Sequence, residues 1–201
     1  MTPAAKEALQ GVDSVVGYGP YVEQVGPLVQ GKNLITMDLG QELERAAKAV
    51  ELAYSGHKVA VVSSGDAGIY GMAGPVFRIL VDRGWDGENP PLEVVPGISA
   101  MQSAAAILGS PLMQDFCAIS LSNLLTPWET IRRRLEAAAQ GDFVVALYNP
   151  RSRKRNQQLQ EARSILLEHR SGQTPVGIVR DAYRSGQGVT LTDLEHLIEH
   201  V

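Results

Sequence analysis

The sequence predicts an α/β fold of two domains, each built on a parallel β-sheet covered by helices. Short runs rich in valine and isoleucine alternate with longer runs whose apolar residues recur at helical spacing, the pattern of strands joined by helical crossovers. Glycine-containing loops follow several of these strand-like runs. The alternation of strand-like and helix-like runs stops near Gly109, Ser110 and Pro111 and then starts again. We therefore expect an N-terminal domain at residues 1–113 and a C-terminal domain at residues 114–201.

The first domain is expected to open on a helix at residues 3–9. In the helix expected at residues 41–55, Leu43, Ala46 and Val50 recur on one face, and Gly56 stands where a helix terminator belongs. Two more helices are expected at residues 70–83 and 99–108. The expected strands are residues 14–18, 33–37, 58–63 and 92–95.

The second domain repeats the alternation. Pro127 suits the start of a helix, and Gly186 and Gly188 indicate a turn before the last strand. The expected strands are residues 116–121, 143–148, 175–179 and 189–191. The expected helices are residues 127–139, 153–169 and 191–201.

The composition excludes several classes of protein. Only 5% of the 201 residues are aromatic and the formal net charge is -4, so we expect no nucleic-acid partner. No apolar run is long enough to span a membrane, and the first residues lack the apolar core of a signal peptide. The single cysteine, Cys117, cannot form an intrachain disulfide. A cytoplasmic location with no membrane partner is expected.

The loop at residues 63–71, SSGDAGIYG, is the first candidate for a ligand site. It follows a strand and precedes a helix, and its glycines let a ligand approach the main chain. Asp66 could accept hydrogen bonds from the ligand or cap the following helix, and the motif leaves both interpretations open. The loop is neither a Walker loop nor a GxGxxG fingerprint.

Three further loops follow strand-like runs. Ser99 lies in VPGISA, where it suits a ligand contact or a helix cap. Asn149 lies in LYNP, where Pro150 keeps it out of the helical region and at the end of its strand. The third loop covers residues 179–184.

A basic segment follows Asn149. Arg151, Arg153, Lys154 and Arg155 place four positive charges within five residues of an acidic protein. Arginine suits carboxylates and phosphates, and a cation at a helix start is disfavoured by the helix dipole unless an anion is near. An anion-binding segment and a solvated helix start both remain open.

The sequence predicts no metal site and assigns no catalytic residue. The histidines are scattered, and His196 and His200, four residues apart, lack a third ligand. No Ser-His-Asp set is recognisable.

Six segments, taken together and in order, resemble the tetrapyrrole methylase family. They are VVGYGPYV, ELERAAKAVELAYSGHKVAVVSSGDAGIYGMAG, VVPGISA, SLSNLLTPWETIRRRL, DFVVALYNPRSRKR and PVGIVRDAYRSGQ, and they span residues 15–187. SSGDAGIYGMAG and LYNPRSRKR are typical of the branch that methylates precorrin-3B at C17, with ring contraction to precorrin-4, in cobalamin biosynthesis. The resemblance implies two α/β domains with the active site in the cleft between them.

The resemblance also implies ligands and partners. S-adenosylmethionine is the expected methyl donor, with S-adenosylhomocysteine as product, and the expected partners are a precorrin ring and a second copy of the chain in a homodimer. The ring carries many carboxylates, for which the basic segment offers anchors. The implied cofactor contacts are Ser64, Gly65, Asp66, Ile69, Ser99, Ala100, Asn149 and Ala182, and the implied substrate contacts are Arg151, Arg153 and Arg155.

The family's fold normally starts with a strand that ends in a Gly-Pro-Gly-like loop and closes with further strands. We expect this chain to lack that first strand and the C-terminal strands. One alternative is therefore an inactive fragment or a cofactor-binding module of the family. Another is an RNA methyltransferase of the same fold, which LYNPRSRKR disfavours. The sequence does not say whether the substrate contains cobalt.

Overall fold

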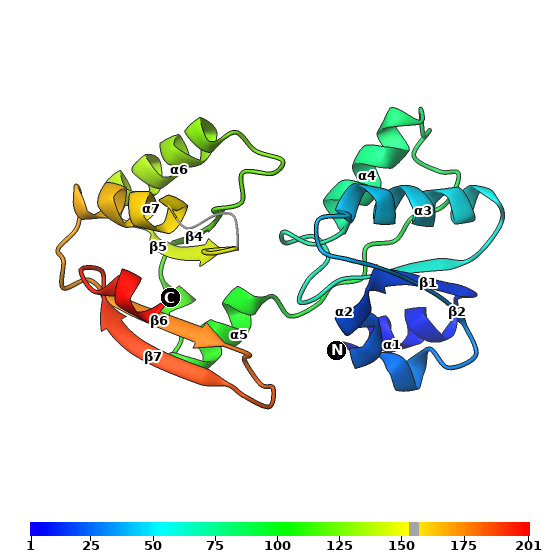
Figure 1. The fold of residues 1–201 in the computed structure, drawn as a ribbon, viewed down its shortest axis with the longest axis horizontal. Coiled ribbons are helices and arrows are strands. Elements are labelled where there is room, and N and C mark those ends of the chain that lie inside the picture. Colours follow the sequence, from blue (N-terminus) through cyan, green and yellow to red (C-terminus); the bar gives the residue numbers. More distant parts are fainter. Residues whose placement is uncertain (153–156) are drawn as a thin grey trace. The chain divides into compact units, whose positions relative to one another are not determined.

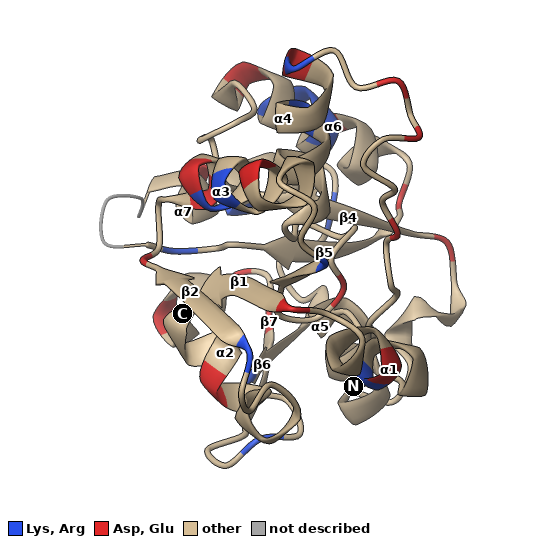
Figure 2. Cartoon of the chain, turned by 90° about the vertical axis from the view of Figure 1, so that its right-hand side faces the viewer, with Lys and Arg blue, Asp and Glu red and all other residues tan. Residues whose placement is uncertain are grey.

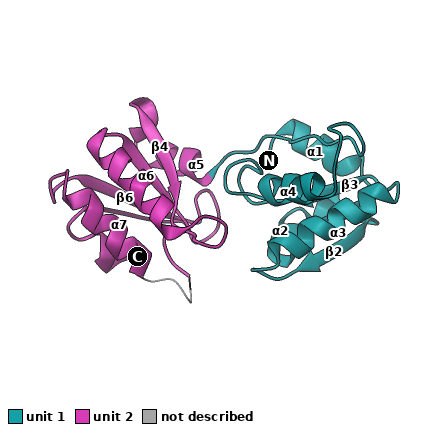
Figure 3. Cartoon of the chain, turned by 90° about the horizontal axis from the view of Figure 1, so that it is seen from above, with its two compact units in different colours: residues 1–99 teal, residues 100–201 magenta. Residues whose placement is uncertain are grey.

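The computed structural model of the chain describes residues 1–152 and 157–201. It forms two compact units, Met1–Ser99 and Ala100–Val201 (Figure 3). This division precedes helix α5 (Ala100–Ile107), whereas the expected boundary at about residue 113 follows it. Each unit is described by itself below.

The first unit contains a three-stranded parallel sheet. Its strands are β1 (Ser14–Tyr18), β2 (Asn33–Met37) and β3 (Val59–Val62), in the order β2-β1-β3. Ser14 of the central strand lies opposite both Asn33 and Val59. Because all three strands are parallel, their carboxyl ends meet at one edge of the sheet, which is where ligands bind in open α/β sheets.

Helices cover both faces of this sheet (Figure 1). Val15 and Val62 point into the core formed with α1 and α2, whereas Val61 points into the core formed with α3 and α4. This alternation follows from the two-residue period of a strand. The covering helices are α1 (Pro3–Gln10), α2 (Gly19–Gln24), the short 3-10 helix η1 (Gly26–Leu28), α3 (Glu42–Tyr54) and α4 (Ala73–Asp82).

Charged residues lie along α3 (Figure 2), and one of them is buried. Arg45 is 3% exposed and donates hydrogen bonds to the main-chain oxygens of Asp38 at 2.7 Å and Met37 at 3.4 Å. Its Nη1 atom also lies 3.5 Å from the sulfur of Met72. A buried charge is costly unless it is hydrogen-bonded. Arg45 therefore ties the loop after β2 to the residue that precedes α4.

The second unit contains two pairs of strands. β4 (Phe116–Ser120) and β5 (Val144–Tyr148) are parallel, and β6 (Pro175–Arg180) and β7 (Gly188–Asp193) form an antiparallel hairpin. Helices α6 (Trp128–Gln140) and α7 (Gln157–Leu167) bury Leu135 and Ile165 against Ile119 of β4. Two short 3-10 helices, η2 (Pro111–Met113) and η3 (Leu197–His200), complete the unit.

The structure confirms the predicted α/β fold with parallel sheets but corrects three elements. Residues 92–95 form no strand, and no described strand pairs with them. The helix expected at residues 70–83 begins only at Ala73, because Tyr70 has a φ of 52°, which is incompatible with a right-handed helix.

The helix expected at residues 191–201 is also wrong. Residues through Asp193 belong to β7, and only η3 follows. Leu194 and Leu197 are buried in the core of the unit, and Arg163 of α7 donates to the main-chain oxygens of Leu194 at 3.0 Å and Glu195 at 2.5 Å. Strand pairing and these side-chain contacts replace the hydrogen bonds that a helix would have made. None of the described helices is both long enough and apolar enough to cross a bilayer.

Candidate functional site

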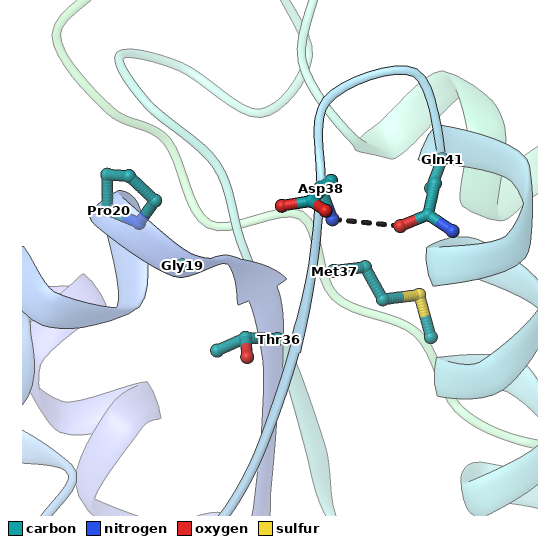
Figure 4. Close-up of a pocket in the computed structure, with 6 residues that line it drawn as sticks. All are labelled: Gly19, Pro20, Thr36, Met37, Asp38 and Gln41. Atoms are coloured by element: carbon teal, nitrogen blue, oxygen red, sulfur yellow. Dashed lines mark hydrogen bonds between the residues drawn. The ribbon is translucent and has the colours of Figure 1, made fainter.

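The carboxyl edge of the first sheet has an open hollow of about 510 Å³ (Figure 4). It lies where β1 and β2 end, and the amide of Asp38 donates a 2.9 Å hydrogen bond to Oε1 of Gln41 there. The lining residues are Gly19, Pro20, Thr36, Met37, Asp38 and Gln41. None of these residues was predicted as a site residue from the sequence, although Gly19 and Pro20 directly follow the first strand. Their position after a strand was the only feature of the sequence that could have indicated a site here, because parallel strands bring their carboxyl ends together.

Asp66 joins two of the loops that were expected to hold a ligand. Its Oδ1 atom accepts a 2.8 Å hydrogen bond from the amide of Gly68, and its Oδ2 atom accepts one of 2.8 Å from the amide of Gly97. The residue before α4 is Met72, so the interpretation of Asp66 as a cap of that helix is wrong. The structure thus brings the loop at residues 63–71 against the segment that leads to Ser99.

The glycines of these two loops allow the main chain to pack against itself. A Cβ atom at Gly97 would collide with the carbonyl group of Gly65. One at Gly71 would lie 2.6 Å from Oγ of Ser63 and 2.7 Å from the main-chain oxygen of Ala67. Gly65 itself has a φ of 70°, a left-handed conformation that glycine adopts at no steric cost. The main chain of the loop remains accessible at Gly65 and Gly68, which are exposed.

Four other expected contacts lie in the two loops or directly after them. Ser64 and Ile69 are half-buried within the loop. Ser99 is 1% exposed, and it directly precedes α5. Ala100, the first residue of α5, is exposed and belongs to the second unit.

Asn149 follows the carboxyl end of a strand in the second unit, as the loop at residues 63–71 does in the first. It directly follows β5, has a φ of 53°, and donates a 2.9 Å hydrogen bond from Nδ2 to Oγ of Ser120 at the end of β4. The hydroxyl oxygen of Tyr148 accepts a 2.9 Å hydrogen bond from the amide of Met101 in α5. Ala100 and Asn149 therefore belong to segments that are joined within this unit.

Ala182 lies in the turn between β6 and β7. It is half-buried, and its neighbours Asp181 and Tyr183 have φ values of 49° and 59°. The amide of Tyr183 donates a 2.7 Å hydrogen bond to Oε1 of Gln187 across the turn. The conformation of this turn is therefore set by its own residues.

The basic segment is described only at its start. Arg151 is exposed, and its Nη1 atom donates a hydrogen bond to the main-chain oxygen of Val201. Arg153 and Arg155 lie outside the described residues.

Within residues 1–152 and 157–201, no group of three His, Cys, Asp or Glu side chains could hold a metal ion. The imidazole of His196 instead pairs with Asp193, with 2.7 Å between Nδ1 and Oδ1, and this hydrogen bond raises the pKa of His196. Burial raises the pKa of the Cys117 thiol, which favours its neutral form over a nucleophilic thiolate.

The fold and its strand-end loops define an α/β protein whose candidate ligand-binding loops follow the carboxyl ends of its parallel strands. Residues 1–198 match the family described as Tetrapyrrole (Corrin/Porphyrin) Methylases, and the chain belongs to this family.

Three relatives match most of the chain. It is 50% identical to Cobalt-factor III methyltransferase of Priestia megaterium over 201 residues, and 47% identical to the Probable cobalt-factor III C(17)-methyltransferase of Salmonella typhimurium over 194 residues. It is 39% identical to Precorrin-3B C(17)-methyltransferase of a Sinorhizobium species over 194 residues. These alignments cover 100%, 96% and 96% of the chain, but only 37% of the Priestia protein, 79% of the Salmonella protein and 76% of the Sinorhizobium protein.

Solved structures agree with this assignment. The methyltransferase CobJ superposes with a TM-score of 0.88 at 40% identity, covering 97% of this chain and 81% of CobJ. Uroporphyrin-III C-methyl transferase from Thermus thermophilus, solved with S-adenosyl homocysteine, superposes with a TM-score of 0.71, covering 99% and 79% of the two chains. At 21% identity, the second likeness shows the fold alone.

Proposed function

We propose that this chain methylates C17 of a precorrin-type ring, converting precorrin-3B to precorrin-4 with ring contraction, in cobalamin biosynthesis. The observation that carries the proposal is whole-chain identity of 39–47% to relatives named C(17)-methyltransferases, two of which the chain spans to 79% and 76% of their length. None of the relatives reported above is named as an RNA methyltransferase, the alternative that the sequence left open.

S-adenosylmethionine is the methyl donor in this proposal, and the described residues fit such a ligand. The loop at residues 63–71 offers exposed main-chain groups at Gly65 and Gly68 for the polar atoms of the ligand, and the half-buried apolar side chain of Ile69 lies in the same loop. Asp66 holds this loop in place through Gly97. Bound S-adenosylmethionine supplies a methyl group on a sulfonium, whose transfer depends on positioning more than on an acid or a base.

The proposed cofactor contacts divide between the two units. Ser64, Gly65, Asp66, Ile69 and Ser99 come from the first unit. Ala100, Asn149 and Ala182 come from the second. Both sets are proposed as contacts of the cofactor.

Arg151, Arg153 and Arg155 bind the carboxylates of the ring in this proposal. Replacement of all three by glutamine should raise KM for the tetrapyrrole and leave the affinity for S-adenosylhomocysteine unchanged. An unchanged tetrapyrrole KM would remove these arginines from the substrate site. The homodimer and the cytoplasmic location are further parts of the proposal, and light scattering of the purified chain tests the first of them.

The experiment for the proposed function has two readouts. Isothermal titration calorimetry with S-adenosylhomocysteine measures cofactor binding. Mass spectrometry after incubation with S-adenosylmethionine and either precorrin-3B or cobalt-factor III measures the gain of one methyl group. Comparison of the two reactions shows whether the substrate contains cobalt. Binding of S-adenosylhomocysteine without methylation of either ring would support the alternative of a cofactor-binding module. Absence of both would overturn the proposal.

A further inference from the structure

The loop between β4 and α6, residues 121–127, holds two large apolar side chains in solvent. Leu124 is 75% exposed and Leu125 is 60% exposed. Single exposed apolar residues are common on protein surfaces and need no explanation. Leu124 and Leu125 are adjacent, however, and they lie in a loop that leaves the carboxyl end of β4. The structure fixes both ends of this loop.

The start of the loop is fixed to the strand end that carries Asn149. Leu121 is fully buried, and its amide donates a 2.9 Å hydrogen bond to the main-chain oxygen of Tyr148. The amide of Ser122 donates to Oγ of Ser120 at 3.2 Å. The same Oγ atom accepts the hydrogen bond from Nδ2 of Asn149. The loop therefore begins one side chain away from a proposed cofactor contact.

The end of the loop is fixed to α6 and α7. Nε1 of Trp128 donates a 2.7 Å hydrogen bond to Oε2 of Glu161, and the indole ring packs against the core of the second unit. The main-chain oxygen of Pro127 accepts a 3.0 Å hydrogen bond from the amide of Thr130. With Leu121 and Ile131 already in the core, the two exposed leucines cannot enter it without breaking these anchors.

We propose that Leu124 and Leu125 form an apolar contact surface for the face of the tetrapyrrole ring. This inference rests on the proposed function and names two residues of its substrate site. A tetrapyrrole has a broad apolar face and a rim of carboxylates. The carboxyl ends of β4 and β5 are followed by matching groups, the leucine pair after β4 and Arg151 after β5. Ligand sites are mostly apolar and contain a few polar groups that orient the ligand. The leucine pair and Arg151 together have this composition.

The test is a double variant, Leu124→Ser with Leu125→Ser, in the full chain. We expect its Kd for precorrin-3B or cobalt-factor III to rise roughly tenfold or more, because the ring loses apolar contact area. Its Kd for S-adenosylhomocysteine should stay within about twofold of the original value. A change of that size is too small to indicate that a contact with the cofactor has been lost. Leu124→Met with Leu125→Met keeps the apolar surface and should keep the affinity for the ring.

Leu191→Ser is the matched control, because Leu191 is 77% exposed but lies on β7. It should bind the ring as the original chain does. An equal loss of ring affinity in this control, or unchanged ring affinity in the double serine variant, overturns the role of the leucine pair and leaves the proposed function standing. If the unaltered chain binds neither tetrapyrrole, both proposals fail together. If the serine variant loses S-adenosylhomocysteine as well, the loop is a structural support and the proposal is wrong.

Discussion

Oδ2 of Asp66 accepts a 2.8 Å hydrogen bond from the amide of Gly97, although 31 residues separate the two in sequence. The second carboxylate oxygen accepts a bond of the same length from Gly68. Hydrogen bonds to an ionised carboxylate are stronger than those between neutral groups. One side chain thus holds together the two loops of the first unit that carry the proposed cofactor contacts.

Replacement of Asp66 by asparagine should loosen this connection. Asparagine keeps one acceptor oxygen, but its NH₂ group would face one of the two glycine amides. We expect the free energy of unfolding to fall by roughly 1–3 kcal/mol and the affinity for S-adenosylhomocysteine to weaken. Urea denaturation and calorimetry measure the two effects. Glu93→Gln, which alters an exposed carboxylate in the neighbouring segment, should change stability by less than about 0.5 kcal/mol.

Gly97→Ala tests the close approach of the same two loops. The added Cβ atom would collide with the carbonyl group of Gly65, so the loops must separate. We expect a loss of about 1–3 kcal/mol in stability together with weaker binding of S-adenosylhomocysteine. Gly74→Ala is the control, because nothing lies within 4 Å of a Cβ atom at that position of α4. Equal behaviour of the two variants in thermal unfolding and calorimetry would show that the contact is unimportant.

Two replacements of Asn149 separate its backbone conformation from its side chain. Glycine tolerates the φ of 53°, whereas alanine adds a strain of about 1–2 kcal/mol. Asn149→Ala should therefore be less stable than Asn149→Gly in urea denaturation. Both lose the amide group, so both should bind S-adenosylhomocysteine more weakly and by similar factors. Unaltered affinity in the glycine variant would exclude the Asn149 side chain from the cofactor site.

The pair formed by Asp193 and His196 should make the end of the chain sensitive to pH. Their hydrogen bond raises the pKa of His196 above its ordinary 6.5 and lowers the pKa of Asp193 below its ordinary 3.8. The contribution of His196 to the stability of the fold is fully present below pH 6.5 and is lost as pH rises through its raised pKa. The contribution of Asp193 is present above pH 3.8 and is lost as pH falls through its lowered pKa. Both side chains therefore contribute fully to stability between pH 3.8 and pH 6.5.

Asp193→Asn should lower the pKa of His196, because the carboxylate that stabilises the imidazolium is gone. NMR titration of the imidazole ring measures this shift directly. Asp82→Asn, on α4 of the first unit, should leave the titration of His196 unchanged. If the asparagine at position 193 had no effect, the contact between the two side chains would not persist in solution.

Much of the fold could be predicted because hydrophobic periodicity is a local property. The strands at residues 14–18 and 33–37 have the expected bounds, and α3 fills most of the expected helix at residues 41–55. The loop at residues 63–71 could be identified as a candidate site from its position after a strand and its glycines. The family could be identified from six segments of sequence, and the match over residues 1–198 confirms it.

Tertiary structure decided the features that depend on a distant partner. Residues 92–95 are as apolar as a strand, but a strand exists only when another strand pairs with it, and none of the described strands does. Residues 191–201 resemble a helix in sequence, yet β7 pairs with β6 through Asp193, and the burial of Leu194 and Leu197 directs the chain that follows. The partner of Asp66 could not be predicted for the same reason. A carboxylate bonds to whichever amide the fold brings near it, and only the folded chain places Gly97 beside residue 66.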